Sequence, residues 1–266
     1  TISTEWNNIA NWDVNAVPND CTHNVVVPSN PPSGNYPAID VVVSVGNIQL
    51  GNNSRITLDA DLNVCGNWTG APATPAILLG NSKVVFQGGA QQSISGKTQF
   101  NTLQANNNAG VQVQSGSAVQ IFTALELKAG DFNAGNNLVT FRSISTTEVG
   151  IINNFSAGFA GTMSGSIKAE RYYDSPAAQS FSQHFMGSPV NAPSVSQFGA
   201  TGVPGIVQPL NCWIDSFAVG SPYGSMYEYV EANGTTCGVQ VWNALTSGTT
   251  VNGKGYSVAR TGAGTL

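Results

Sequence analysis

Residues 48–64 read IQLGNNSRITLDADLNV, and this stretch decides the predicted fold. It contains three runs of three or four residues in which apolar and polar side chains alternate, separated by Gly, Asn and Asp. Such runs predict short β-strands, because alternate side chains of a strand lie on opposite faces and these separators favour turns. No long stretch has the apolar period of a helix, so the chain is predicted to be all-β. Similar runs recur at residues 25–27, 41–43, 83–86, 110–113, 125–127 and 138–141.

The strands predicted between about residues 40 and 145 are short, and no clear two-residue hairpin turns connect them. This favours a parallel β-helix or solenoid, in which each rung buries its inward side chains against the neighbouring rungs. The Asn-containing turns suit rung corners, because Asn and Gly tolerate the left-handed backbone conformation. An antiparallel sandwich also uses short strands with frequent turns, and it remains the alternative.

Segments of different composition divide the chain into two predicted domains. Residues 1–160 are predicted to form the β-solenoid, with the Trp- and Pro-rich residues 6–37 capping its open end. Small uncharged residues at 156–165 are interpreted as a linker or a transition. Residues 161–266 are predicted to form a β-sandwich-like domain. Its predicted strands are 167–173, a pair at 226–230 and 239–242, and 255–259.

The composition fits an exported β protein and excludes several classes of partner. Only 9% of the residues are charged, so Asn, Ser, Thr, Gln and Gly must form the surface. The net charge is −5 and the nine basic residues form no cluster, which argues against nucleic acid and anionic membranes as partners. No apolar run reaches 18 residues, so no membrane insertion is expected.

The two ends of the sequence suggest a processed chain. It begins at Thr1 without an initiator Met, which we interpret as removal of a leader, with a trimmed chain as the alternative. It stops within a Gly-rich sequence at Leu266, and we expect the natural protein to continue beyond this residue, truncating the second domain here.

Four cysteines occur, and they allow three full pairings. Their placement, two early and two late, suggests the disulfides Cys21–Cys65 and Cys212–Cys237. Disulfides indicate an oxidising compartment and therefore an extracellular or cell-surface location. Four free thiols are the alternative, and a zinc site is disfavoured because the sequence has no CxxC and two histidines in all.

Candidate catalytic and metal-binding residues are few. Neither His23 nor His184 lies near a Gly-x-Ser-x-Gly elbow, so each is interpreted as structural. Asp59 and Asp61 lie two residues apart and therefore on one side of a strand. They are interpreted as a solvated face, with a weak Ca²⁺ site as the alternative, so no cofactor is predicted.

Aromatic residues provide candidates for carbohydrate binding, since exposed rings can stack on the faces of sugars. Trp6, Trp12 and Trp68 in the first half are candidates too, although aromatic side chains in a β protein commonly belong to the core. The candidates of the C-terminal half are Trp213, Tyr223, Tyr227, Tyr229 and Trp242.

Several motifs follow one another along the chain: Trp12…Val17-Pro18, 25–28, 36–39, 47–50, 62–68, 84–96, 100–103, 170–172, 186–190 and 253–256. Their order resembles large secreted surface proteins of Bacteroidota. This resemblance implies export by the type IX secretion pathway and display on, or release from, the cell surface. The family is functionally mixed and its pattern defines no catalytic residue that could be carried over.

These observations predict a non-enzymatic structural or adhesion module, secreted or at the cell surface and part of a larger exported protein. The expected partner is an extracellular surface, a glycan or a protein of the secretion machinery. Carbohydrate binding through the C-terminal half is the first alternative function. A polysaccharide-active enzyme on a β-helix is the second.

Overall fold

The computed structural model describes residues 3–145, 147–153, 157–170 and 172–173, and five further strands. The chain divides into two units, Thr1–Glu170 and Arg171–Leu266, and each is described by itself. The division lies after Glu170, whereas the sequence placed a boundary at residue 160. The helices of the described part are two single 3₁₀ turns, η1 (Ile9–Asn11) and η2 (Pro32–Gly34), and none of its helices is long and apolar enough to cross a membrane.

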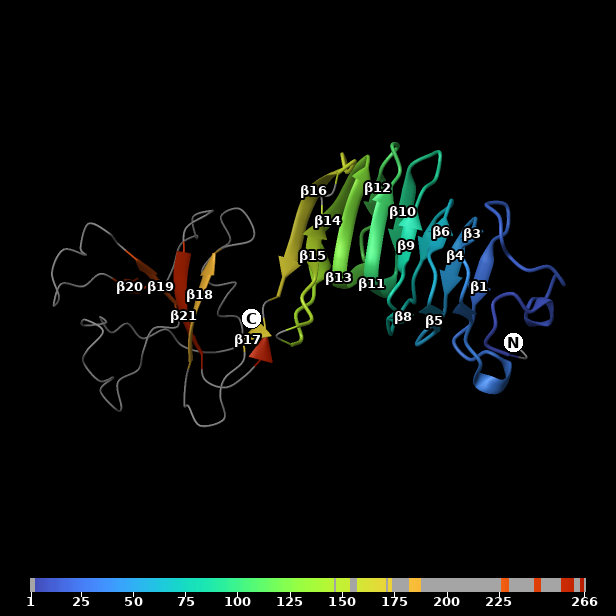
Figure 1. Cartoon of the computed structure of the whole chain (residues 1–266), viewed down its shortest axis with the longest axis horizontal. Coiled ribbons are helices and arrows are strands. Elements are labelled where there is room, and N and C mark those ends of the chain that lie inside the picture. The colour runs from blue at the N-terminus through green and yellow to red at the C-terminus, as the bar shows by residue number, and fades with distance from the viewer. Residues whose placement is uncertain are drawn as a thin grey trace. The chain divides into compact units, whose positions relative to one another are not determined.

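The first unit is a parallel β-solenoid, with its strands following one another from β1 to β16 (Figure 1). Each turn visits three faces. The first face contains β1 (Val25–Val27), β4 (Ile48–Leu50), β7 (Trp68–Thr69), β10 (Gln92–Ser95), β12 (Val111–Val113) and the beginnings of β14 (Asp131–Phe141) and β16 (Thr162–Ala169). The second face contains β2 (Ala38–Ile39), β5 (Arg55–Leu58), β8 (Ala76–Gly80), the first parts of β11 (Lys97–Asn106) and β13 (Ala118–Ala129), and the ends of β14 and β16. The third face contains β3 (Val43–Val45), β6 (Leu62–Val64), β9 (Lys83–Phe86), the later parts of β11 and β13, and β15 (Ile151–Asn153).

Every pairing between these strands is parallel, which confirms the solenoid and excludes the antiparallel sandwich for this unit. Several strands keep the bounds predicted from the sequence, among them β4, β5 and β6. The run at 41–43 is an exception, because β3 begins at Val43. Val41 and Val42 lie at the corner before it and are 48% and 60% exposed.

Equivalent positions of successive turns stack to form the core. On the third face, one inward column pairs residues in register along β3, β6, β9, β11, β13 and β15. Its members up to β13 are at most 1% exposed. Burying such a side chain contributes about 1.5–3 kcal/mol, so each added turn stabilises its neighbours. The column is Val43, Leu62, Val84, Leu103, Leu125 and Ile152.

The N-terminal residues cover the first turn of the coil. The backbone near Trp6 runs alongside β2, where Trp6 N donates to Ala38 O (3.0 Å) and Ala38 N donates to Thr4 O (2.6 Å). The Trp6 ring is fully buried and meets the Trp12 ring edge-on, with centroids 4.7 Å apart. Its Nε1 donates to Pro18 O (2.8 Å), so the buried indole N–H is satisfied. An apolar plug with satisfied polar groups therefore closes the core at this end.

The segment interpreted as a linker or a transition, residues 156–165, contains the beginning of the last strand of the coil. β16 begins at Thr162 and pairs with β14, so the expectation of a linker extending to residue 165 is wrong. The strand expected at 167–173 is likewise divided between β16 and β17 (Tyr172–Tyr173). The small residues concealed this strand because ladder hydrogen bonds are made by the backbone and need no apolar side chain.

The described strands of the second unit are antiparallel. β17 pairs with β22 (Gly264–Thr265), and a four-stranded sheet has the order β18-β21-β19-β20. Of the predicted pair at 226–230 and 239–242, the first strand corresponds to β19 and the second shares Trp242 with β20, while residues 239–241 lie outside the described residues. The predicted strand at 255–259 corresponds to β21. The all-β prediction is thus confirmed for the first unit and for the described strands of the second. The remaining bounds are β18 (Ser182–Gly187), β19 (Met226–Tyr229), β20 (Trp242–Ala244) and β21 (Gly255–Arg260).

Candidate functional site

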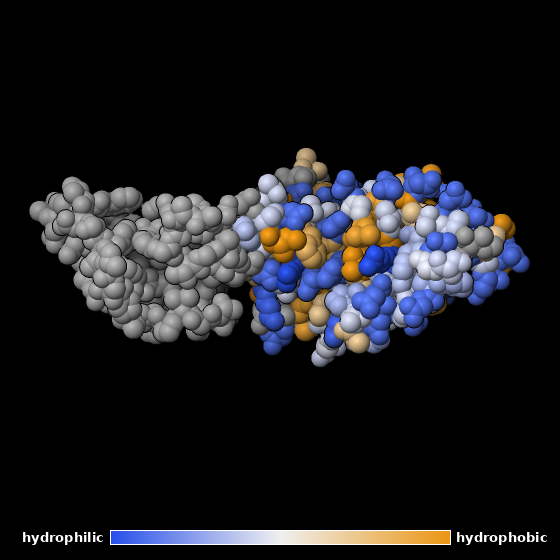
Figure 2. Space-filling model, turned by 90° about the horizontal axis from the view of Figure 1, so that it is seen from below, coloured by the Kyte–Doolittle hydropathy of each residue, from blue (hydrophilic) through white to orange (hydrophobic). Residues whose placement is uncertain are grey.

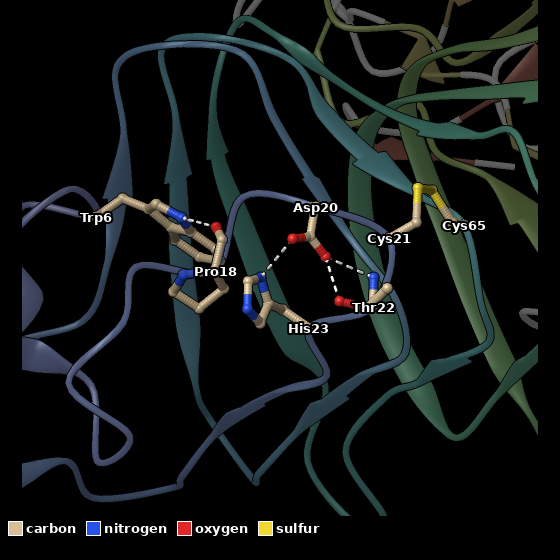
Figure 3. Close-up of polar contacts among 7 residues, drawn as sticks. All are labelled: Trp6, Pro18, Asp20, Cys21, Thr22, His23 and Cys65. Carbon is tan, nitrogen blue, oxygen red and sulfur yellow. Dashed lines mark hydrogen bonds and ion pairs between the residues drawn. A yellow bond between two sulfur atoms is a disulfide. The ribbon is translucent and has the colours of Figure 1, made fainter.

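A disulfide joins the N-terminal loop to the body of the coil (Figure 3). Cys21 and Cys65 are bonded, with their Cα atoms 5.4 Å apart, although 44 residues separate them in the sequence. Cys65 directly follows β6, so the covalent link holds the loop against the corner between the third and first faces. This confirms one predicted pairing. Cys212 and Cys237 lie outside the described residues, and their pairing stays a prediction.

The residues flanking Cys21 form a small polar cluster (Figure 3). The Asp20 carboxylate accepts hydrogen bonds from Thr22 N (2.7 Å) and Thr22 Oγ1 (2.5 Å), and its other oxygen lies 3.4 Å from His23 Nδ1. These hydrogen bonds, chiefly the one from the Thr22 hydroxyl, with a smaller contribution from the charge of His23, hold the pKa of Asp20 below its usual value. The Thr22 hydroxyl donates to the acid and not to the histidine, so His23 does not activate it as a nucleophile. His184, the other histidine, lies in β18 opposite Val258.

An asparagine ladder runs along the corner between the third and first faces. Asn47 N donates to Asn24 Oδ1, and Asn67 N donates to Asn47 Oδ1, both at 2.8 Å. Ser93 N continues the ladder by donating to Asn67 Oδ1 (2.8 Å). Each side-chain oxygen satisfies a backbone donor of the next turn, so the ladder staples consecutive turns together. The sequence analysis missed it, although Gly-Asn before an apolar strand repeats at residues 46–47 and 66–67.

A second polar network lies inside the coil near the same corner. Gln92 and Asn107 are 2% and 1% exposed. Gln92 Nε2 donates to Val64 O (2.8 Å) and Gly66 O (2.5 Å), while its Oε1 accepts from Gly88 N (2.8 Å) and Asn107 Nδ2 (2.9 Å). The amide of Gln92 therefore meets both its donor and its acceptor capacity, as a buried polar group must. This network is structural.

Two ion pairs connect turns on the outside of the coil. Lys83 Nζ lies 2.9 Å from Glu126 Oε2, which also accepts from Gln104 Nε2 (2.5 Å). Near the end of the unit, Arg142 Nη1 lies 2.9 Å from Glu170 Oε1. Each of these carboxylates pairs with a cation. The pairs are partly buried, and each joins one turn of the coil to another. Sequence reasoning missed both pairs, because the partners are 43 and 28 residues apart.

The acidic residues singled out from the sequence do not converge. Asp59 is exposed, and Asp61 accepts a hydrogen bond from Lys83 N (3.3 Å). Within the part of the chain that the structure describes, no group of three or more His, Cys, Asp or Glu residues could hold a metal ion. The placement of Asp59 and Asp61 therefore fits a solvated corner stabilised by a backbone donor.

The candidate aromatic residues fall into two groups. Trp6 and Trp68 are fully buried, so these two cannot stack on a sugar, and Trp12 is partly buried and packed against the core. Trp213 and Tyr223 lie outside the described residues. On the second unit, Tyr229 of β19 lies opposite Trp242 of β20 in the register, and Tyr227 lies two positions along β19. These three positions share one face of the sheet.

No protein-family model, no curated protein and no solved structure matches this chain. Its function is therefore inferred from the arrangement of its own residues.

Proposed function

We propose that this chain is a non-enzymatic structural and adhesion module of the cell exterior, and part of a larger protein exported through the type IX pathway of Bacteroidota. The observation that carries the proposal is the uninterrupted parallel coil from β1 to β16. Its job is mechanical: the coil spaces other parts of the protein from the cell and holds them in place.

The contacts between turns support this role. Neighbouring turns are joined by backbone ladders on three faces, and the asparagine ladder and ion pairs add side-chain links across the same steps. Turns that are bonded to both neighbours bend and slide only when many hydrogen bonds break together. Such a coil is suited to a spacer.

The disulfide supports export. A bond between Cys21 and Cys65 persists in an oxidising compartment and is rare in the cytosol. It also secures the loop that closes the apolar end of the coil. Both properties suit a protein that functions outside the cell.

Protease treatment of intact producing cells, combined with intact-mass measurement, tests the proposal. We expect external protease to release fragments of this chain, the Cys21–Cys65 peptides to be linked, and the native mass to exceed 27.6 kDa. A protein protected inside the cell, with both cysteines reduced, would contradict it. An internal marker protein provides the control for leakage. If the marker is cleaved at the same rate as this chain, the protease has reached the inside of the cells.

Carbohydrate binding by the second unit is a second candidate, favoured by the register of Tyr229 and Trp242. The test is a glycan array probed with the whole chain and with the Tyr229→Ala and Trp242→Ala variants. Binding lost in both variants and kept in Asn243→Ala supports it, since Asn243 lies at the neighbouring register position. Binding unchanged by all three substitutions, or no binding by the unmodified chain, counts against it.

A further inference from the structure

The second face of the coil carries an unbroken outward column of side chains in register. Three of its four central members are polar and the fourth is Ile77, all four are partly exposed, and its two terminal members are exposed cations. The chain neighbours of the members from Arg55 to Thr140 are buried, and Ile167 beside Lys168 packs against the core, so the column lies on the outer surface. The column is Arg55, Ile77, Gln99, Gln120, Thr140 and Lys168.

The polar groups of this column are largely unused. Gln99 Nε2 donates to Gln120 Oε1 (3.1 Å), which leaves the Gln120 amide hydrogens free to donate outward. Among the described residues, neither Arg55 nor Lys168 forms an ion pair. The acid nearest to Lys168 in sequence is Glu170, and Arg142 holds it (2.9 Å). Two unpaired cations with donors between them are thus aligned along the coil.

The spacing of the column selects the shape of a ligand. Adjacent parallel strands lie about 4.8 Å apart, so the five steps from Arg55 to Lys168 span about 24 Å. A ligand that uses both ends must be extended, and it must run along the coil axis. Leu79, 43% exposed on β8 two positions from Ile77, adds apolar surface beside the column.

We propose that this column, the second-face column, binds an extended acidic polysaccharide of uronate type. Arg55 and Lys168 bind its carboxylates, and Gln120 and Thr140 bind its hydroxyls. Successive sugars of an extended chain advance by a distance similar to the strand spacing, so one sugar can meet each turn. A nucleic acid fits less well, because the nine basic residues of the chain form no cluster that follows a phosphate backbone.

Binding of polyuronate by the whole chain tests the proposal, with a neutral polysaccharide of similar length as the comparison. We expect polyuronate binding that weakens with salt, and weaker binding by oligomers shorter than about 24 Å, which cannot reach both cations. Arg55→Gln and Lys168→Gln should each weaken binding by about threefold, and the double variant by about tenfold.

Lys128→Gln is the matched control, because Lys128 is an exposed cation of β13 outside the column. Retained binding in this variant, with loss in the double variant, supports a specific column. An equal loss of binding in Lys128→Gln overturns the proposal, and so does a lack of polyuronate binding by the unmodified chain. It is also overturned if Tyr229→Ala loses binding while Arg55→Gln and Lys168→Gln have no effect. Unchanged thermal unfolding of the variants shows that their loss of binding is not loss of fold. The spacer role does not depend on any of these outcomes.

Discussion

Single residues at the corners decide whether one turn of the coil can stack on the next. Gly66 precedes Asn67, a member of the asparagine ladder, and its Cα lies against the turn before it. A Cβ at Gly66 would lie 2.5 Å from Asn47 Oδ1 and 2.9 Å from Asn47 N. Both atoms belong to the ladder and its backbone, so neither can move without disturbing a hydrogen bond between turns.

Gly66→Ala is therefore expected to lower the free energy of unfolding by about 1–3 kcal/mol, as overpacking typically does. Denaturant unfolding measures the change. Gly89→Ala is the control, because nothing lies within 4 Å of a Cβ at Gly89 and a change below about 0.5 kcal/mol is expected. Equal stability of the two variants would show that the corner does not need a glycine.

Asp20 gives the cap a pH dependence of known sign. Its pKa is lowered in the folded chain, mainly by the hydrogen bond from the Thr22 hydroxyl. The stabilisation is therefore complete above the unfolded value of about 3.9, and it is lost as the pH falls through the lower, folded pKa. Thermal unfolding measured from pH 6 down to about pH 3 should show a smaller decrease for Asp20→Asn than for the unmodified chain. Identical pH profiles would mean that the Asp20 contacts contribute nothing to the fold.

At the scale of elements, the apolar alternation predicted where strands lie, and the absence of hairpin turns predicted that they pair in parallel. The bounds of β4, β5 and β6 followed directly from alternation. The start of β3 at Val43 did not follow from alternation. Three consecutive valines do not alternate, so the sequence does not show that Val41 and Val42 lie at an exposed corner. The first part of β16, residues 162–166, was missed because its side chains are small and most are exposed, so its signal lies in backbone pairing.

The candidate site was less predictable than the strands. Pairing of Cys21 with Cys65 could be inferred from their places in the sequence, and the structure confirms it. The second-face column could not be found, because its members are single residues about 20 apart whose alignment depends on the length of every intervening corner. The ion pair between Lys83 and Glu126 could not be found for the same reason.

The disulfide links the cap loop to the corner that follows β6, and it closes a loop of 44 residues. Closing a loop of this length in the unfolded chain corresponds to about 4 kcal/mol of stabilisation in the chain-entropy account. The Cys21→Ser/Cys65→Ser double variant is expected to lose up to this amount. Denaturant unfolding gives the loss, and a double variant as stable as the unmodified chain would refute the role of the link.

At the scale of the whole molecule, the proposed spacer requires that each turn of the first unit be an equivalent, separable step. Val111 of β12 lies opposite Phe132 of β14, so residues 111–131 form one complete turn. Removing them brings Phe132 to the position of Val111 and leaves the cap, the disulfide and the Gln92–Asn107 network in place. A spacer assembled from such steps should become shorter and otherwise remain folded.

The most direct test of this account is the distance between spin labels on Gln49 and Ser164, which are exposed on β4 and β16, with and without residues 111–131. The account predicts that the deletion shortens the distance by about 4.8 Å, one strand spacing, with an equally narrow distribution and cooperative unfolding retained. A broad distribution, an unchanged distance or loss of cooperative unfolding would contradict a coil of equivalent turns, and with it the proposed spacer.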